Sequence, residues 1–408
     1  MNKKVVLITI FSLLFLVALS FLFIRQRKSA AQQNVNVAFY NIPEKQAKVL
    51  EDNIKKAEIG RVTFKTVSFD DLKKDKAAKS YDLVFTYDGL ASEAIKAKAA
   101  NIPSKLFNYL PTSLRRQNEP NDRKSIPIIL DHFEFSYSKL VESKIAMENP
   151  QTFDEMLTYL EKAKKYTFTP FFTNGGDDEI LLGLISAIIE AKGGYKAYST
   201  FVEALKKSPS AEKLMTLKLA DAGLKGASGA GEELTLQSVL DLFRSWQENG
   251  IVHPNWFHAK YRDILAFVED GQVALLFTKL SVHRNIPYKL IRDFSTERVP
   301  VLSGQVDHAL IAPSLCAIKL SKKNVNDKVI QKLLTEDIQS ALSMGSQLAP
   351  VALRGESFDV QADDVRFFAA SCRYGARADA LSSAFMPESE AAKKFCDEIR
   401  RYLTTGRF

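Results

Sequence analysis

Three strand–helix units in succession between residues 34 and 99 constrain the fold of this chain more than any other feature. Residues 34–42 alternate apolar and polar side chains, as a half-buried strand does, and an amphipathic helix follows. A second strand at 62–67 and a third at 81–86 are each followed by a further helix. This order predicts a parallel sheet with helices on its faces, which is an α/β fold.

An apolar run precedes these units. Residues 5–24 contain only three hydroxyl side chains and no charge, and at about 1.5 Å per residue the run matches a hydrocarbon core of about 30 Å. A basic stretch at 25–28 separates the run from small residues at 29–31, which disfavours cleavage by signal peptidase. No cysteine lies near the run to carry a lipid. We therefore expect an uncleaved signal anchor, which is a single N-terminal transmembrane helix.

The net charge of +8 raises the question of nucleic-acid binding. Five of the 56 Lys and Arg residues flank the apolar run, which leaves 51 bases against 48 acids in the rest of the chain. These charges are mixed along the sequence rather than gathered into a stripe. A solvated mixed surface is predicted, and no nucleic-acid partner.

The remaining elements follow from caps and periodicity. Thr152 and Glu155 form a capping-box pattern at the start of one helix, and Thr235 is a second expected N-cap. The expected elements, in chain order, are an extended segment at 126–137, helices at 149–165 and 179–191, a stop at Gly193-Gly194, a flexible loop at 226–231 and a helix at 235–248.

Taken in order, four stretches are similar to the family 1 extracellular solute-binding proteins, the maltose-binding-protein-like receptors of ABC importers. The first is an inter-lobe crossing with the helix after it, and the second is a helix ending in Asn-Gly-Ile-Val-His-Pro. The third is a glycine-containing segment, and the fourth is the closing series of strands and helices. The stretches are residues 126–157, 240–254, 267–277 and 299–351.

The resemblance implies a two-lobed, periplasmic-binding-protein-like α/β fold with a hinge. Residues 1–33 would be anchor and linker, 34–128 with 312–350 lobe one, and 129–311 with 351–408 lobe two. It further implies that a small polar solute binds between the lobes on the extracytoplasmic side of the membrane and passes to ABC permease subunits. Carbohydrate remains a candidate, although residues 277–284 lack the Trp that sugar binders of the family commonly use for stacking.

Four candidate ligand-binding residues lie at strand ends or at the first crossing. Tyr87 and Asp88 end the third strand, where Asp88 can bind ligand hydroxyls or simply cap the next helix. Asp131 and His132 either face the cleft or pack in the hinge.

Five further candidates lie in loops. Asn174 and Asp177 either present polar groups to a ligand or form a turn and a helix cap. His283 and Arg284 suit an acidic or phosphorylated ligand, and a solvated loop explains them equally well. Tyr374 lies where family members add aromatic contacts.

The sequence predicts a binding protein rather than an enzyme, with no cofactor and no metal. A nucleophile elbow and a phosphate-binding loop are missing, and His253 and His258 are wrongly spaced to bind a metal on one helix face. The alternative is a membrane-anchored scaffold or sensor that keeps the binding-protein fold without transport. A hydrolase with two carboxylates stays open as a third reading, because such acids need not be close in sequence.

Three cysteines contain no C-x-x-C pair, which favours buried thiols. A bridge between Cys372 and Cys396 is the alternative that the spacing leaves open.

Overall fold

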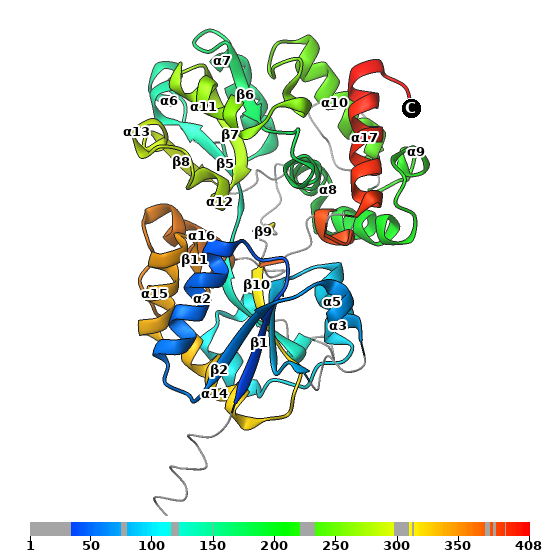
Figure 1. The fold of residues 1–408 in the computed structure, drawn as a ribbon. Helices are drawn as coiled ribbons and strands as arrows, with labels where there is room; N and C mark the ends of the chain where they lie inside the picture. The colour runs from blue at the N-terminus through cyan, green and yellow to red at the C-terminus, as the bar shows by residue number, and fades with distance from the viewer. Residues whose placement is uncertain are drawn as a thin grey trace, which may run out of the picture.

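The computed structural model of the chain has two lobes, each built on its own β-sheet (Figure 1). A segment that continues from one sheet into the other joins them. The structure describes residues 34–74, 80–115, 122–148, 150–220, 233–297, 310–311, 314–371, 376–377, 381–387 and 389–408.

Lobe one contains a six-stranded sheet in the order β11-β4-β10-β3-β1-β2. As the sequence predicts, β1 pairs in parallel with both β2 and β3. The later strand β10 lies between β3 and β4 and is antiparallel to both. The strands are β1 (Val35–Phe39), β2 (Val62–Thr66), β3 (Leu83–Tyr87), β4 (Ser125–Leu130), β10 (Ser314–Lys319) and β11 (Ala349–Pro350).

Helices cover both faces of this sheet, because its central strands have apolar side chains on both sides. Val37 and Phe39 of β1 face a core that includes Leu50 of α2, whereas Ala38 faces a second core that includes Ile95 of α5. The helices of the lobe are α2 (Glu44–Lys56), α3 (Phe69–Lys73), α5 (Leu90–Lys96), α14 (Asn324–Leu333), α15 (Glu336–Ser346) and α16 (Val360–Ser371).

Helix α16 differs from the sequence expectation, which placed residues 351–408 with lobe two. Its residues Ala362, Val365 and Ala369 are buried in the core of lobe one. The small side chains let the helix lie close to β11, and it also contacts β8 of lobe two. Helix α17 (Glu390–Thr405) does pack in the core of lobe two.

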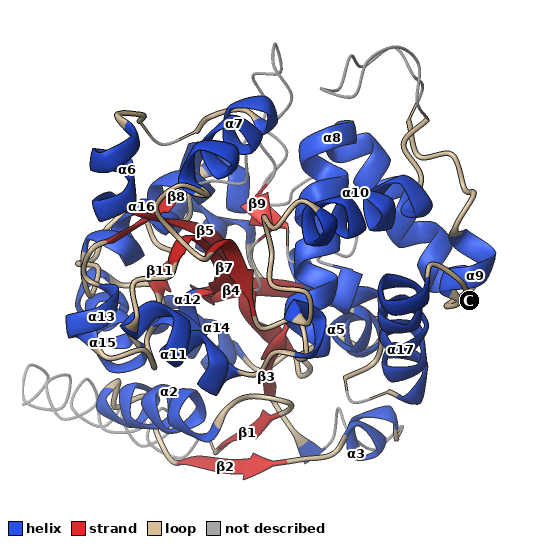
Figure 2. Cartoon of the chain, turned by 90° about the horizontal axis from the view of Figure 1, so that it is seen from above, coloured by secondary structure: helices blue, strands red, loops and turns tan. Residues whose placement is uncertain are grey.

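Lobe two contains a four-stranded sheet in the order β6-β7-β5-β8, in which β5 is antiparallel to its neighbours β7 and β8. Figure 2 shows α8, α10 and α17 gathered to one side of this sheet. The strands are β5 (Phe133–Ser138), β6 (Thr169–Thr173), β7 (Val273–Lys279) and β8 (Phe294–Glu297). The helices are α6 (Lys139–Ile145), α7 (Phe153–Ala163), α8 (Asp178–Lys207), α9 (Ala211–Leu214), α10 (Leu236–Glu248), α11 (Tyr261–Glu269), α12 (Leu280–His283), α13 (Tyr288–Ile291) and α17.

The expected helix stop at Gly193-Gly194 is a kink instead. Gly194 has φ 72° and ψ 179°, a conformation that breaks the helical direction and that glycine adopts without strain. The chain then resumes a helix that ends at Lys207, so α8 is 30 residues long. The sequence pattern alone predicts the end of this helix too early, because a glycine can bend a helix as well as terminate it.

Two other expectations are confirmed. Thr152 and Glu155 form the capping box of α7, and Thr235 caps α10. The extended segment at 126–137 divides at residues 131 and 132 into β4 and β5, which belong to different sheets. These two residues are therefore a crossing between the lobes.

Several expectations fall on residues that the structure does not describe. The apolar run at 5–24, the glycine-rich loop at 226–231, Cys372 and Tyr374 lie outside the described residues. Within the described ranges, no helix is both long and apolar enough to span a bilayer. Cys316 and Cys396 are buried free thiols, in agreement with the expectation for these two.

Candidate functional site

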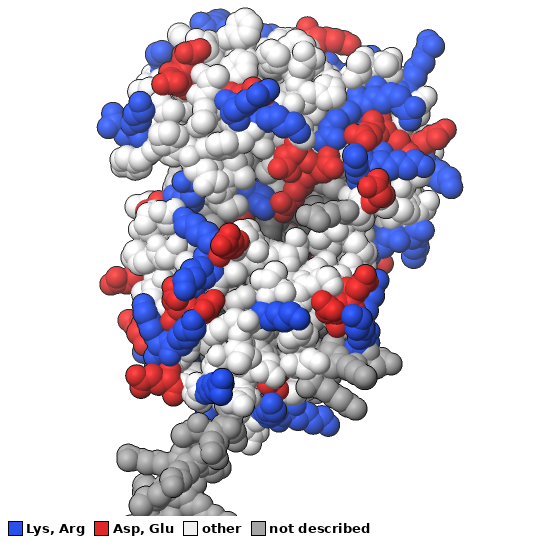
Figure 3. Space-filling view, viewed as in Figure 1, with Lys and Arg blue, Asp and Glu red and all other residues white. Residues whose placement is uncertain are grey.

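A cleft with a volume of about 1050 Å³ opens between the lobes. Its walls come from the carboxyl ends of β1, β2 and β3 in lobe one and from the start of α8, the end of β7 and the start of α17 in lobe two. Figure 3 shows the surface hollowed at this level, with acidic and basic side chains at the rim. The carboxyl ends of parallel strands are where α/β folds bind ligands, so the position fits a binding site.

A carboxylate–lysine–carboxylate group lies at the bottom of the cleft. The Lys279 ammonium donates to both carboxylate oxygens of Glu179 at 2.9 Å and lies 3.6 Å from Oδ2 of Asp131. Burial would lower the pKa of Lys279, but the two carboxylates outweigh it and raise the pKa above its ordinary value. The lysine therefore stays charged, and Glu179 remains partly exposed toward the cleft.

Tyr87 provides an aromatic ring in the wall of lobe one. Its hydroxyl donates to Oε1 of Gln46 on α2 at 2.6 Å, and both residues line the cleft. Burial and the nearby charge of Asp131 raise the pKa of Tyr87, so the phenol remains a neutral donor. Phe385 adds a second aromatic side chain from lobe two.

Asp88 lines the cleft, but its carboxylate already accepts hydrogen bonds from other groups of the protein. Its Oδ1 accepts from Ser92 Oγ and Lys96 Nζ, both at 2.7 Å, and from the Gly89 amide. These contacts hold Asp88 beside the start of α5, but the N-cap residue of that helix is Gly89 and not, as the capping reading had it, Asp88.

Asp131 connects the cleft to the short helix α12. Its Oδ1 accepts from the amides of His132 and Ser281, and its Oδ2 accepts from Ser281 Oγ at 2.6 Å. Desolvation raises the pKa of Asp131, while Lys279 and these donors act against that effect. A carboxylate on the crossing segment thus holds the first turn of α12.

Arg284, directly after α12, binds lobe one. Its guanidinium makes two 2.6 Å bonds with the carboxylate of Asp359 and donates to Oε1 of Gln361 and the carbonyl of Gln347. The side chain is 11% exposed. The sequence readings for Arg284 were an anionic-ligand contact or a solvated loop, and the structure instead places it in an inter-lobe ion pair at the edge of the cleft.

His132 and His283 lie beneath the cleft wall and do not line it. His283 Nδ1 pairs with Glu134 Oε1 in the interior, and the His132 ring lies 6.1 Å from the ring of Phe368 of α16, tilted by 46°. His132 is fully buried and neither of its ring nitrogens has a hydrogen-bond partner among the described residues, so desolvation lowers its pKa to about 4. For His132 this placement matches the hinge-packing reading.

Asn174 and Asp177 line a separate pocket of about 660 Å³ at the start of α8. Asp177 caps α8 by accepting from the amides of Glu179 and Ile180, as the turn-and-cap reading predicts. Of the candidates, the structure brings Tyr87, Asp88, Asp131 and Arg284 together in the cleft.

Sequence reasoning missed Lys279, Glu179, Gln46 and Ser281, all of which line the cleft. Lys279 ends β7 and Glu179 stands in the first turn of α8, so their positions at element ends were available signals. Their partnership was not available, because the two residues are 100 positions apart.

The charges around the cleft are largely matched. Asp88 is paired with Lys96, Asp178 with Arg400 and Arg284 with Asp359. The charges that remain in the lining are negative on Asp131, Glu179 and Glu390 and positive on Lys45, Lys279 and Lys393, so they balance. The site therefore presents polar groups without a net charge.

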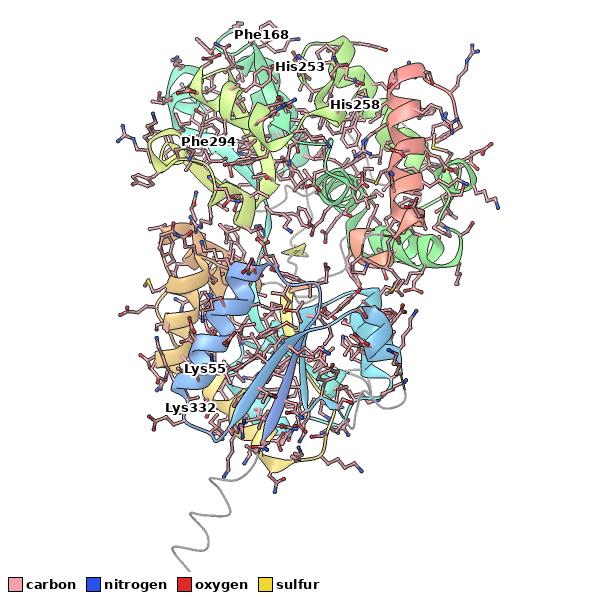
Figure 4. The ribbon with its side chains drawn as sticks, in the orientation of Figure 1. Lys55, Phe168, His253, His258, Phe294 and Lys332 are labelled. Carbon is pink, nitrogen blue, oxygen red and sulfur yellow. The ribbon has the colours of Figure 1, made fainter. Side chains whose placement is uncertain are left out.

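The described residues contain no group of three or more His, Cys, Asp and Glu side chains arranged to bind a metal. Figure 4 shows His253 and His258 in lobe two, away from the gap between the lobes. The cleft can donate and accept hydrogen bonds and present ring faces to a solute, which is the chemistry of reversible binding.

Two α/β lobes around a polar cleft define the binding-protein class of fold, and solved structures of that class match the chain along most of its length. The bacterial solute receptor AcbH, described as having an exclusive preference for β-D-galactopyranose, has 14% identity and a TM-score of 0.71, with 91% of this chain and 92% of that chain covered. Apo RafE from Streptococcus pneumoniae has 16% identity and a TM-score of 0.65, with 91% and 94% covered.

A family 1 extracellular solute-binding protein from Bifidobacterium longum subsp. infantis has 12% identity and a TM-score of 0.62, with 93% and 96% covered. No family model and no curated protein matches the sequence. The chain thus has the fold of the family 1 extracellular solute-binding proteins, and these similar structures are receptors and binding proteins rather than enzymes.

Proposed function

We propose that this protein is an extracytoplasmic receptor that binds a small, uncharged, hydroxyl-rich solute between its lobes for delivery to an ABC importer. The observation that carries the proposal is the roomy cleft, in which hydrogen-bonding groups and the ring of Tyr87 meet without net charge. A scaffold that had lost binding would have no need to keep such a volume open between its lobes.

The similar structures support a sugar as the solute. AcbH is described with a galactopyranose, and RafE was solved in complex with raffinose. Neutral sugars present hydroxyl groups to carboxylates and an apolar ring face to aromatic side chains, and the cleft offers both partners. The membrane anchor at 5–24 and the partnership with permease subunits belong to the same proposal.

A thermal-shift screen tests the proposed solute class. The full chain is heated with neutral mono- and oligosaccharides, polyols and phosphorylated sugars. A solute present at about 100 times its Kd stabilises the folded state by about 2.7 kcal/mol, which raises Tm by about 3 °C for a chain of this size. Stabilisation by phosphorylated sugars alone would contradict the uncharged-solute proposal, and no stabilisation by any of them would favour the scaffold.

Variants of Tyr87 locate the binding. We expect Tyr87→Ala to abolish the shift, because the ring is lost, and Tyr87→Phe to keep most of it, because only the hydroxyl bond to Gln46 is removed. Tyr166→Ala is the matched control, since Tyr166 is 45% exposed in lobe two outside the cleft. If Tyr87→Ala and Tyr166→Ala changed the solute-induced shift in Tm equally, the solute would bind outside the cleft.

A further inference from the structure

Along one edge of the cleft, lobe two holds lobe one through an arginine. Arg284 is the C-cap residue of α12, and its hydrogen-bond partners are Asp359, Gln361 and the carbonyl of Gln347, all in lobe one. Its guanidinium carbon also lies 5.4 Å from the centre of the Phe358 ring. Figure 1 shows α12, α15 and α16 together at this edge. We call Arg284 with these four partners the latch.

Helix α12, which carries the arginine, is fixed to lobe two at both of its ends. At its start, the amide and hydroxyl of Ser281 donate to the buried carboxylate of Asp131 on the crossing segment. At its end, His283 pairs with Glu134 of β5 in the interior. The helix is only four residues long, so it cannot move without moving Arg284. Asp131 also lies beside the lysine at the bottom of the cleft, which makes α12 a direct connection from the cleft to the latch.

Helix α16, on the other side of the latch, presents one face to each lobe. The face in the core of lobe one consists of Ala362, Val365 and Ala369. Gln361 and Phe368 are seven positions apart, so they share a second face of the helix. Gln361 accepts from Arg284, and the ring of Phe368 lies 6.1 Å from the ring of His132 on the crossing segment. Helix α16 therefore belongs to lobe one but is held by lobe two along its length.

The opposite edge is joined more weakly. Lys206 Nζ, near the end of α8, lies 3.4 Å from the carboxylate of Glu93 on α5, and these side chains are 21% and 49% exposed. Such an exposed pair contributes little and is screened by salt. The Arg284 side chain is 11% exposed and makes two parallel bonds to a carboxylate, which is the strong and orienting form of the interaction. Figures 1 and 2 show α16 and α5 on opposite sides of lobe one, so the two edges resist separation unequally.

We propose that the latch sets the angle between the lobes: it holds the edge formed by α12 and α16 together, and the lobes separate at the edge formed by α5 and α8. Arg284 is then a positioning residue, which acts on the cleft through the arrangement of the lobes. A solute at the bottom of the cleft would act on the same device, because Asp131 holds α12 from that position. The proposal concerns the motion of the lobes and does not rest on the proposed solute.

Spin labels on the two lobes measure the separation of the α5–α8 edge. They are attached through Ala97→Cys at the end of α5 and Thr200→Cys on α8, in a Cys372→Ser background. Both positions are exposed, and Cys316 and Cys396 are buried. Pulsed electron paramagnetic resonance of the full chain without solute then gives the distribution of distances between the labels.

Two variants release the latch. Arg284→Met keeps a long apolar side chain but removes every hydrogen bond of the guanidinium, and we expect the ratio of longer to shorter distances to rise about tenfold. Asp359→Asn removes the charge of the main partner and keeps an oxygen that can accept from the Ala362 amide at the start of α16. This second variant, which preserves the helix cap, should shift the distribution in the same direction.

Two controls separate the latch from a general effect of lost charge. Lys206→Met breaks the pair at the opposite edge, and Arg292→Met removes an arginine from an exposed pair within lobe two. Both should leave the distribution unchanged. An unchanged distribution in both Arg284→Met and Asp359→Asn, or an equal shift in Lys206→Met, would overturn the proposal. Because no solute is present, neither result bears on the proposed function.

Discussion

Replacing Asp131 by Ala is expected to destabilise the protein strongly. The residue is fully buried, and its carboxylate accepts three hydrogen bonds and lies 3.6 Å from the Lys279 ammonium. Alanine leaves the amide and hydroxyl of Ser281 without an acceptor at the start of α12. It also removes one of the two carboxylates that hold the charge of Lys279.

The magnitude follows from what remains after the substitution. Breaking a buried ion pair by removing one partner costs about 3–5 kcal/mol. Glu179 still binds Lys279 through both of its oxygens, so the lysine charge is not left unpaired. Removing Asp131 also relieves the desolvation that raises its pKa. Both effects place the expected loss near the lower limit, at about 3 kcal/mol. Asp131→Asn keeps an oxygen acceptor and should cost about half as much.

Urea unfolding followed by circular dichroism measures this loss. The midpoint should fall in Asp131→Ala with an unchanged m-value, because the folded state buries the same surface. Glu269→Ala, which removes an exposed carboxylate in the same lobe, is the control and should change stability by less than about 0.5 kcal/mol. A loss below about 1 kcal/mol in Asp131→Ala would show that the carboxylate does not hold α12.

Three further predictions concern the hinge and the core of lobe two. The pKa of buried His132 is about 4, whereas a histidine in the unfolded chain has a pKa near 6.5, so the unfolded state binds more protons between these pH values. The free energy of unfolding should therefore fall by about 3 kcal/mol as the pH is lowered through this window. Urea unfolding of His132→Phe should show a smaller fall over the same pH range. Arg284→Lys should lower the free energy of unfolding almost as much as Arg284→Met, by about 2 kcal/mol in the same assay, because an ammonium cannot reproduce the two parallel bonds to Asp359. A lysine variant as stable as the original protein would contradict this. Gly183→Ala should lower the free energy of unfolding by about 1–3 kcal/mol, because a Cβ there would lie 2.4 Å from the Phe133 ring, and an unchanged thermal midpoint would show that the ring moves aside.

Much of the fold was readable from the sequence because local patterns determine it. The apolar alternation of residues 34–42 and the capping box at Thr152 depend only on near neighbours, and both gave elements that the structure contains. The kink at Gly194 was misread as a helix end, since the packing that lets α8 continue comes from other parts of the chain. The place of α16 in lobe one was missed for the same reason.

The site was readable only in part. Tyr87 and Asp131 were found because a strand end and a crossing are recognisable positions, and both line the cleft. His283 was expected there as well, but its pairing with the buried Glu134 turns it inward, and the two residues are 149 positions apart. Contacts over such separations leave no local pattern, so the group formed by Lys279, Glu179 and Asp131 could not be assembled from sequence spacing.

The position of β10 in the middle of the lobe-one sheet has a consequence for folding during synthesis. Strand β4 pairs with β10 and β11, and the sheet joins β4 to β3 only through β10. A ribosome that has completed residues 34–130 has therefore made a sheet with its central strand missing, and that strand emerges only after the whole of β5 to β8. The four strands of lobe two are synthesised without an intervening strand of the other lobe. The sheet of lobe one, in contrast, keeps unpaired strand edges until β10 has been synthesised. Lobe two in turn lacks α17 until the end of the chain has been made, so neither lobe is complete before the C-terminal quarter of the chain has been synthesised.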